Sequence, residues 1–406
     1  MRLLHEIAPV LAGRFLLNFA YLKMTRSLQN TERRRRMMKT KRGVCAGIVF
    51  FLLFICGCGQ QNGRSGDNLE IKNGDTIARQ LTEDVSMNAV VQIPEAGLDS
   101  VERCTVRNQW FNGKEMAERA FPQIPESEWD YPDNTGQGIS SSALYEGNLN
   151  IKEGGEAVPG MIYLGPGINI STDRSQAARN CFKHAILGIR ISDIHSQKEF
   201  AFASIEEAAE EVDHYWQEIT GLEGAAFFCA FSVSHEAILE EQEIMLKIEE
   251  EVGADYPIDI YEWDETDDCY DIRMELLVNG IPLTADPMLR EDGIYVPSGE
   301  IRAIYTSDGI VNLSYALGSY EILKKDSVDL VSMDVLFEAL EKKFSMMITG
   351  KTEIDRMQMV YYPIPLSPDL EVREYDLVPA WRFWFKTGEM MNCFYINAIT
   401  GEEIVS

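Results

Sequence analysis

The chain has 406 residues, with 37 lysines and arginines against 65 aspartates and glutamates, which gives a formal net charge of −28. Hydrophobic residues make up 45% and aromatic residues 10%, enough for a sizeable core, so the composition argues against a disordered chain. The acidic balance repels phosphate backbones and therefore argues against a nucleic-acid-binding protein.

A basic segment and an apolar run lie near the amino terminus. Lys39, Lys41 and Arg42 precede the run at 44–55. Its length falls within the ~7–15 residues of a secretory signal and short of the ~20 that span a bilayer. The pattern predicts a signal peptide over residues 37–57 instead of a transmembrane helix.

The apolar run ends in Ile55, Cys56, Gly57 and Cys58, an aliphatic residue, two small residues and a cysteine. These four residues resemble the lipobox of bacterial lipoproteins, whose cysteine thiol accepts a diacylglycerol before cleavage. The resemblance implies lipidation at Cys58 and a protein held by that lipid on the extracytoplasmic face of the cell membrane. Two acyl chains would hold it stably, because a single chain anchors only marginally.

Residues 1–36 lie upstream of this signal and include the basic run 33–36. They are either an additional basic segment at a membrane surface or an overextended start, which we favour because signal n-regions are short. Residues 1–57 hold 11 of the basic and 2 of the acidic residues, so a chain that begins at Cys58 has 26 basic and 63 acidic residues, a net charge of −37. Residues 58–78 are polar and lack hydrophobic periodicity, which predicts a tether.

The folded part is predicted to comprise two α+β subdomains, 79–195 and 196–406. Alternation at 85–93 predicts a strand, and residues 101–110 are expected to return beside it. The segment 126–167 carries turn signals and is expected to be a loop-rich boundary between units.

Later elements have clearer patterns. A capping box at Ser204 and Glu207 predicts a helix to about Gly221, followed by a strand at 225–233 and a helix that Ser234 caps. A strand at 272–278, a hairpin at 301–315, a helix after Ser332 and strands at 354–362, 377–385 and 392–399 follow. The short connections imply antiparallel pairing, so we predict an α+β fold with antiparallel sheets, each packed by one or two helices.

The last unit contains the sequences LVPAWRF at 377–383 and YINAITGE at 395–402. With the preceding helix, they resemble the PepSY-like and YycI-like modules of bacterial surface proteins, and the module would cover 325–406. As a whole, the chain is similar to uncharacterised surface lipoproteins of Firmicutes, of clostridial type. The resemblance implies a regulatory role without catalytic residues and a surface or membrane protein as partner. YycI-like regulators contact a kinase partly through a transmembrane helix, which a lipid anchor does not supply.

Enzyme motifs are incomplete. The triplet at 386–388 matches the KTG element of β-lactamases, but the chain has no Ser-x-x-Lys nucleophile, so a hairpin turn is the simpler interpretation. The histidines show no HExxH or i,i+4 pair, and His235 lies at a helix start, where a capping position is expected. The cysteines after Cys58 are five and far apart, without metal spacing; one or two disulfides remain open. We expect no cofactor and no metal site.

Two features remain as candidates. Asp264, Asp267 and Asp268 can offer oxygen ligands to Ca²⁺, but the segment lacks the glycine of an EF-hand, and a solvated acidic loop is the expectation. Trp381 and Trp384 are three apart on a predicted strand and should face opposite sides of the sheet. Trp384 is the candidate contact for a partner.

The sequence therefore predicts a non-catalytic, lipid-anchored protein that binds or regulates a partner. The alternative is a ligand-binding or hydrolytic surface lipoprotein acting on wall or peptide substrates. A pocket with perturbed carboxylates beside Trp263 or Trp384 would favour the alternative, whereas an exposed sheet edge or apolar patch would favour partner binding.

Overall fold

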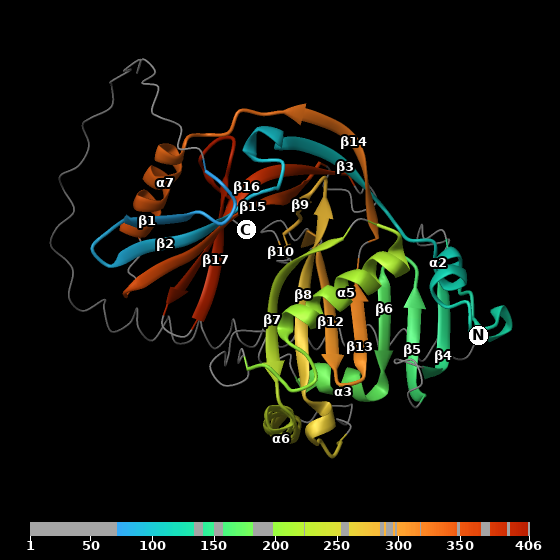
Figure 1. The fold of residues 1–406 in the computed structure, drawn as a ribbon. Helices are drawn as coiled ribbons and strands as arrows, with labels where there is room; N and C mark the ends of the chain where they lie inside the picture. Colours follow the sequence, from blue (N-terminus) through green and yellow to red (C-terminus); the bar gives the residue numbers. More distant parts are fainter. Residues whose placement is uncertain are drawn as a thin grey trace, which may run out of the picture. The chain divides into compact units, whose positions relative to one another are not determined.

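The structure, a computed structural model, describes residues 71–133, 141–149, 157–181, 198–222, 224–252, 260–284, 288–289, 295–296, 299–316, 318–346, 350–366, 374–387 and 390–404. All of them belong to one compact unit, Gly66–Ser406. Their strands form two large, mostly antiparallel sheets accompanied by a few helices (Figure 1). The predicted α+β class is confirmed in this form, with strands more abundant than helices.

The first sheet has the strand order β1-β2-β15-β16-β17-β18, and β3 pairs with both β14 and β16. Its strands are β1 (Thr76–Gln80), β2 (Val85–Gln92), β3 (Glu102–Gln109), β14 (Ser319–Ser327), β15 (Thr352–Pro365), β16 (Glu374–Thr387), β17 (Met390–Asn397) and β18 (Glu403–Ile404). The start of β16 pairs with β3 and its later part pairs with β17, while β15 runs along its other edge. β16 thus joins the β3–β14 pair to the rest of the sheet.

This sheet brings together segments that are far apart in the sequence. β2 pairs in parallel with β15, with Val85 opposite Thr352, whereas the other strand pairs of the sheet are antiparallel. The expectation that residues 101–110 return beside the strand at 85–93 was wrong, because β1 and β15 occupy the two edges of β2. The predicted tether over 58–78 also ends early, since Thr76 already pairs with Val90.

Helix α7 (Met333–Met346) packs on the first sheet through Leu336, Phe337, Leu340 and Phe344. The Phe344 ring meets Phe385 of β16 at 5.8 Å and Phe394 of β17 at 5.7 Å between centroids, both edge-on. Such edge-to-face pairs add about 0.5–1.5 kcal/mol to the burial of the rings. The prediction of one helix packed on an antiparallel meander is confirmed.

The second sheet has the order β4-β5-β6-β13-β12-β8-β7, with β9 paired to β8. Its strands are β4 (Ala143–Leu149), β5 (Val158–Leu164), β6 (Ile168–Thr172), β7 (Ala225–Val233), β8 (Cys269–Val278), β9 (Ile281–Pro282), β12 (Glu300–Thr306) and β13 (Gly309–Tyr315), and a separate pair consists of β10 (Met288–Leu289) and β11 (Tyr295–Val296). The strands at 225–233 and 272–278 and the hairpin at 301–315 are confirmed as predicted.

The predicted loop-rich boundary at 126–167 was wrong, because β4 and β5 lie within it and pair antiparallel. Gly147 lies opposite Gly160 in this pair, and a Cβ at position 160 would approach the carbonyl oxygen of Ser171 to 2.5 Å. Glycine allows close strand approach here. It also removes side chains on which a strand pattern depends, which is why the sequence did not indicate strands.

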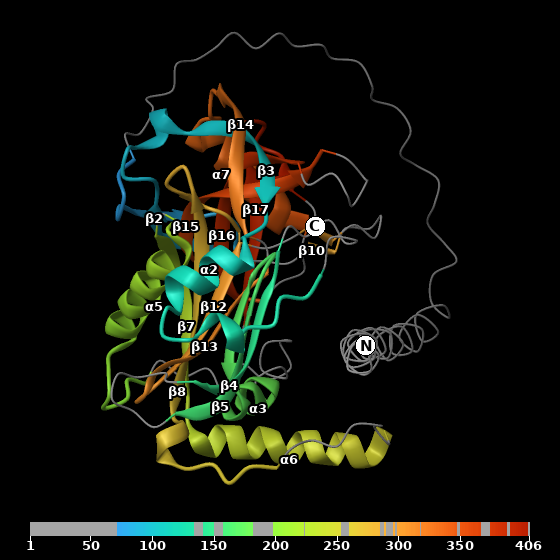
Figure 2. The ribbon, with the colours of Figure 1, turned by 90° about the vertical axis from the view of Figure 1, so that its right-hand side faces the viewer.

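Helices cover both faces of the second sheet (Figures 1 and 2). α2 (Gly113–Ala120) and α5 (Ile205–Thr220) pack on one face, and α3 (Asp173–Cys181) and α6 (His235–Val252) pack on the other. Three short 3-10 turns are η1 (Leu98–Ser100), η2 (Glu126–Glu128) and η4 (Glu265–Asp267). Among the described helices, none is both long and apolar enough to cross a membrane.

The capping box of α5 is confirmed. The Ser204 hydroxyl accepts from the Glu207 amide at 3.1 Å, and the Glu207 carboxylate accepts from the Ser204 amide at 2.9 Å. Gly221 ends the helix in the left-handed region, with φ of 68°, where glycine carries no steric penalty. The buried stripe, which includes Val212 and Trp216, fixes which side of α5 faces the sheet.

The two sheets contact one another through a buried ion pair. Arg382 of β16 donates to the carboxylate of Glu275 on β8 at 2.5 and 2.7 Å, and both side chains are 0% exposed. Gln358 accepts another bond from Arg382, and the Phe228 ring lies 4.7 Å from the guanidinium carbon. Burial alone would lower the pKa of Arg382, but attraction and hydrogen bonds from Glu275 outweigh it and raise the pKa.

Further ion pairs continue along the same face of β8. Asp271 accepts from Arg302 of β12 at 2.7 Å, and Arg273 lies 3.1 Å from Glu300. A backbone link also joins the sheets, since the amide of Thr284, just beyond β9, donates to the carbonyl of Tyr361 on β15 at 3.1 Å.

Each sheet takes strands from both sides of residue 195. The sheets therefore do not follow the predicted segments 79–195 and 196–406. A division of the chain into two subdomains stays a prediction.

We expect that removing one partner of the buried ion pair destabilises the fold strongly. Arg382→Met or Glu275→Met leaves one charge buried alone, which costs about 3–5 kcal/mol in unfolding free energy. The double variant buries two apolar side chains instead and should recover most of that loss. Urea denaturation of the four proteins measures this cycle, and additive losses would contradict the assignment of a coupled pair.

Candidate functional site

A groove lies on the face of the second sheet that carries α2 and α5, with a volume of about 670 Å³. Helix α5 forms one wall, and the end of α2 with the segment up to η2 forms the other. β4, β5, β6 and β13 pass beneath it (Figure 1). The volume falls within the ~300–1,000 Å³ of typical ligand sites.

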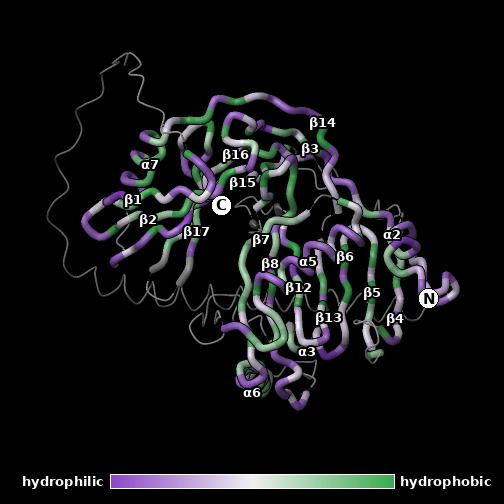
Figure 3. The backbone as a smooth tube through the Cα atoms, in the orientation of Figure 1, coloured by the Kyte–Doolittle hydropathy of each residue, from purple (hydrophilic) through white to green (hydrophobic). Residues whose placement is uncertain are grey.

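The floor of the groove is apolar. It consists of Leu149, Ile162, Ile170 and Ile310. β5, which contributes Ile162, is largely hydrophobic, whereas β6 alternates hydrophobic and polar residues (Figure 3). At the opposite wall, Phe121 packs against Trp129 with ring centroids 6.1 Å apart. The floor is therefore held by the same core that supports the sheet.

The rim of the groove is acidic. Glu128 comes from η2, and Glu211 and Glu218 come from α5. All three side chains are exposed, and no lysine or arginine is among the described residues that line the groove. Unbalanced carboxylates around an apolar floor favour a ligand that is both cationic and apolar.

The spacing along α5 explains how one helix supplies both core and site. Glu211, His214, Tyr215 and Glu218 recur at helical intervals, which places them on one face next to the buried stripe. Glu211 is held in place by Tyr305 of β12, whose hydroxyl donates to its carboxylate at 2.6 Å. Burial and this bond raise the pKa of Tyr305, so the phenol stays a donor at neutral pH.

The described lining residues include no serine, threonine, cysteine or lysine. The side chains able to act on a ligand there are carboxylates, an imidazole, phenols and amides. They can bind a cation, donate and accept hydrogen bonds, or transfer protons, but they offer no hydroxyl or thiol of the usual acyl-transfer kind.

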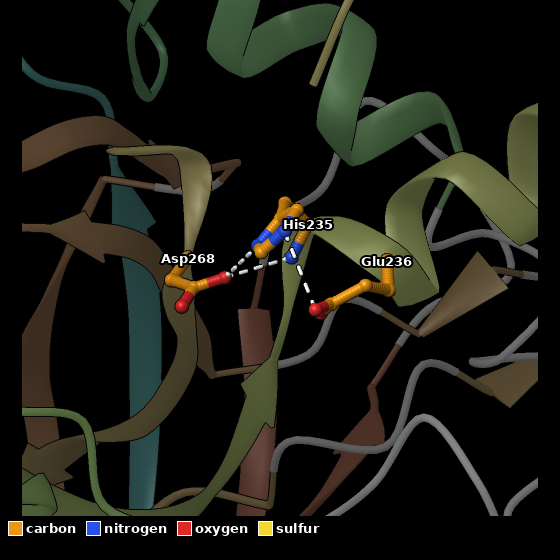
Figure 4. A group of neighbouring side chains, drawn as sticks. All are labelled: His235, Glu236 and Asp268. Carbon is orange, nitrogen blue, oxygen red and sulfur yellow. Dashed lines mark hydrogen bonds and ion pairs between the residues drawn. The ribbon is translucent and has the colours of Figure 1, made fainter. Parts of the chain in front are cut away.

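A second cluster, at the start of α6, has the composition of a metal site. Ligand atoms of His235, Glu236 and Asp268 lie within 4.8 Å of one another. Figure 4 shows Asp268 directed at both the ring and the backbone of His235, with Nδ1 and the amide nitrogen each 2.8 Å from Oδ1. Asp268 therefore accepts from the first backbone amide of α6 and links the helix start to the loop before β8.

The three aspartates of the candidate calcium site interact with different residues. Asp264 accepts from the amide of Thr266 at 2.9 Å, Asp267 pairs with Arg174, and Asp268 pairs with His235. These bonds do not favour a shared cation. Calcium binding by Asp264, Asp267 and Asp268 stays a prediction.

Trp381 and Trp384 differ in burial, as their spacing predicted. Trp381 is 1% exposed and faces the α7 side of the core, whereas Trp384 is half-buried and lies 5.2 Å from Phe228 between centroids. Trp384 thus packs at the contact between the two sheets. Neither Trp384 nor Trp263 lines the groove, and a partner contact at Trp384 stays a prediction.

Several predicted features lie outside the described residues: the signal peptide, the lipobox residues Ile55, Cys56 and Gly57, the lipidation site Cys58, and also His184, His195 and Gly388. Four later cysteines are described and form no disulfide with one another, namely Cys104, Cys229, Cys269 and Cys393. Burial raises the pKa of Cys229 to about 12, which keeps it a neutral thiol.

The sequence did not predict the groove. Its acidic rim comes from α5 and η2, which are far apart in the chain, and two of its floor residues, Leu149 and Ile162, come from strands within the segment predicted as loop-rich. One wall of the groove could have been found from the sequence, because Glu211, His214 and Glu218 form a polar stripe beside the apolar stripe of the predicted helix.

We expect the pKa of His235 to lie above the ordinary value of a histidine. The hydrogen bond that the His235 ring donates to Asp268 raises the pKa of His235, burial opposes this, and Glu236 adds attraction. Its contribution to stability is therefore fully present below the unfolded value near 6.5 and is lost as the pH rises through the higher folded value. An Asp268→Asn variant keeps an oxygen acceptor but loses the charge, so the pKa of His235 should fall.

NMR titration of the imidazole resonances in the wild-type protein and in Asp268→Asn measures this shift. An unaltered His235 titration in Asp268→Asn would refute the pairing.

No protein-family model matches the chain, and no curated protein matches it. Among solved structures, the chain is similar to an uncharacterised protein from Eubacterium rectale, with a TM-score of 0.58 and 15% identity over 82% of this chain and 93% of that one. It also matches the C-terminal domain of YpeB from Bacillus megaterium, with a TM-score of 0.27 and 10% identity over 71% of this chain and 92% of that one. The first likeness shows a shared fold and leaves activity open.

Proposed function

We propose that this protein is a lipid-anchored, extracytoplasmic, non-catalytic protein that binds a partner through the groove on its second sheet. The observation that carries the proposal is the groove itself, in which an apolar floor is surrounded by the carboxylates of Glu128, Glu211 and Glu218. A surface of this kind suits recognition, because the floor supplies burial and the rim selects by charge.

The lipid anchor rests on the sequence. A signal followed by Ile55, Cys56, Gly57 and Cys58 predicts a diacylglycerol on Cys58, and two acyl chains suffice for stable attachment. The strongly acidic mature chain would be repelled by anionic lipid head groups, so the lipid would provide the contact with the cell membrane. The partner would then be a surface or membrane protein near the same membrane.

The regulatory part of the proposal comes from the resemblance of residues 325–406 to PepSY-like and YycI-like modules. In those residues α7 packs on the meander of β15, β16 and β17. This order of helix and strands agrees with the resemblance. A role in restraining or regulating a surface protein would need no cofactor and no catalytic residue.

The alternative is a ligand-binding or hydrolytic lipoprotein acting on wall or peptide substrates. The volume of the groove and its three carboxylates favour this alternative, because carboxylates can serve as acid and base. Against it, the groove is remote from Trp263 and Trp384, beside which such a site was expected.

Co-purification from native membranes tests the proposal. In mild detergent, the wild-type protein should retain a stoichiometric surface or membrane protein, whereas Cys58→Ala should lose both the membrane and that partner. If neither form retains a protein while the purified chain hydrolyses wall or peptide substrates, the partner-binding function is wrong and the alternative takes its place.

A further inference from the structure

The groove has the charge of a receptor for cations. Glu128, Glu211 and Glu218 face it from two walls, and no described lysine or arginine lines it. The cations of the neighbouring α2 have other partners: Lys114 pairs with Glu126 at 2.9 Å, and Arg119 donates to the carbonyl of Ile219. The rim carboxylates are thus left without a lysine or arginine side chain from the described lining of the groove.

The groove is also more than a charged surface. Ile162 is 2% exposed and Ile170 is 8% exposed, so both are fixed by the core of the sheet. Beside them, Ile124 and Ile310 are only partly buried and leave apolar surface that a ligand can cover. A small hydrophilic cation would satisfy the rim and leave this floor unused.

The volume and the negative charge of the groove restrict the kind of ligand further. About 670 Å³ of open volume accommodates several side chains, which suits a short peptide segment. A nucleic acid is repelled by the rim, and a second copy of this chain, with its net charge of −28, is disfavoured for the same reason.

We propose that the groove binds a basic peptide segment of the partner protein, with lysine or arginine side chains at Glu128, Glu211 and Glu218 and an aliphatic side chain between them on the floor. This inference rests on the proposed partner-binding function and names the chemistry of the partner. Glu211 accepts a hydrogen bond from Tyr305 at 2.6 Å, which fixes the position of its carboxylate. Glu128 and Glu218, at opposite walls, set the positions of the outer cations.

The first test uses the purified full-length chain and fluorescein-labelled pentapeptides, followed by fluorescence anisotropy. One peptide alternates lysine with leucine, a second alternates lysine with serine, and a third alternates glutamate with leucine. The lysine–leucine peptide should bind most tightly, the lysine–serine peptide at least about fivefold more weakly because it leaves the floor uncovered, and the glutamate–leucine peptide not measurably. Binding of the lysine–serine or the glutamate–leucine peptide as tight as that of the lysine–leucine peptide would overturn the inference.

Charge reversal locates the peptide in the groove. Glu128→Lys/Glu218→Lys should weaken the lysine–leucine peptide at least about tenfold, because like charges then face one another. The matched control is Glu83→Lys/Glu338→Lys, which makes the same change in net charge at two exposed positions outside the groove and should leave affinity within about twofold. If both double variants weaken binding equally, only the overall charge attracts the peptide and the groove is not its site.

A milder double variant controls for the chance that charge reversal unfolds the protein. Glu128→Gln/Glu218→Gln keeps size and hydrogen bonding and should weaken the peptide about three- to tenfold. Raising salt from about 0.1 M to about 1 M shortens the Debye length from about 10 Å to about 3 Å and should weaken wild-type binding more than binding by this variant. The same salt response in both proteins would contradict contact with Glu128 and Glu218.

The membrane co-purification separates this inference from the proposed function. Loss of the retained partner in Glu128→Lys/Glu218→Lys, but not in the matched control, supports both. A partner that stays with the charge-reversed variant leaves the partner-binding function standing and refutes the groove as its site. Tight peptide binding without any retained partner supports the groove chemistry and counts against the function.

Discussion

The contact between the two sheets is built around an ion pair that water does not reach. Arg382 and Glu275 are both fully buried, and the surrounding Gln358, Phe228 and Trp384 supply hydrogen bonding and ring contacts to the guanidinium. A charge in this position is tolerable only with its partner in place. The pair therefore makes the correct docking of β16 against β8 a condition for burying either residue, and it specifies the register of the contact more sharply than apolar side chains would.

On the opposite face of the second sheet, one helix serves two purposes. The buried stripe of α5 anchors it to the strands, and the adjoining stripe of Glu211, His214, Tyr215 and Glu218 forms a wall of the groove. The helical period fixes both stripes at once, so the rim cannot shift without disturbing the core. The bond from Tyr305 to Glu211 ties this wall to β12 as well. The binding surface is thus pre-organised by packing and gains its selectivity from charge.

The sequence predicted the local elements well and the long-range ones poorly. Helix α5 was predictable because its capping box, its apolar stripe and Gly221 all give the same boundaries. The pairing of β2 with β15 was not predictable, because the local sequence of a strand does not indicate which distant strand it pairs with. The groove was not predicted for the same reason, and also because Gly147 and Gly160 interrupt the strand pattern of β4 and β5. Lipidation at Cys58 is a purely local motif and remains a prediction from sequence alone.

The parallel pairing of β2 with β15 has a consequence for the order in which the chain can fold. A ribosome or an export channel delivers the chain amino terminus first, so β1, β2 and β3 appear long before β15 and β16, which hold them in one sheet. Contacts between residues so distant along the chain form slowly. Until β16 has emerged, Glu275 also lacks its partner Arg382, so the contact between the two sheets cannot form. The first sheet can therefore be completed only after β15 and β16 have emerged, and until then β1, β2 and β3 lack the strands that join them.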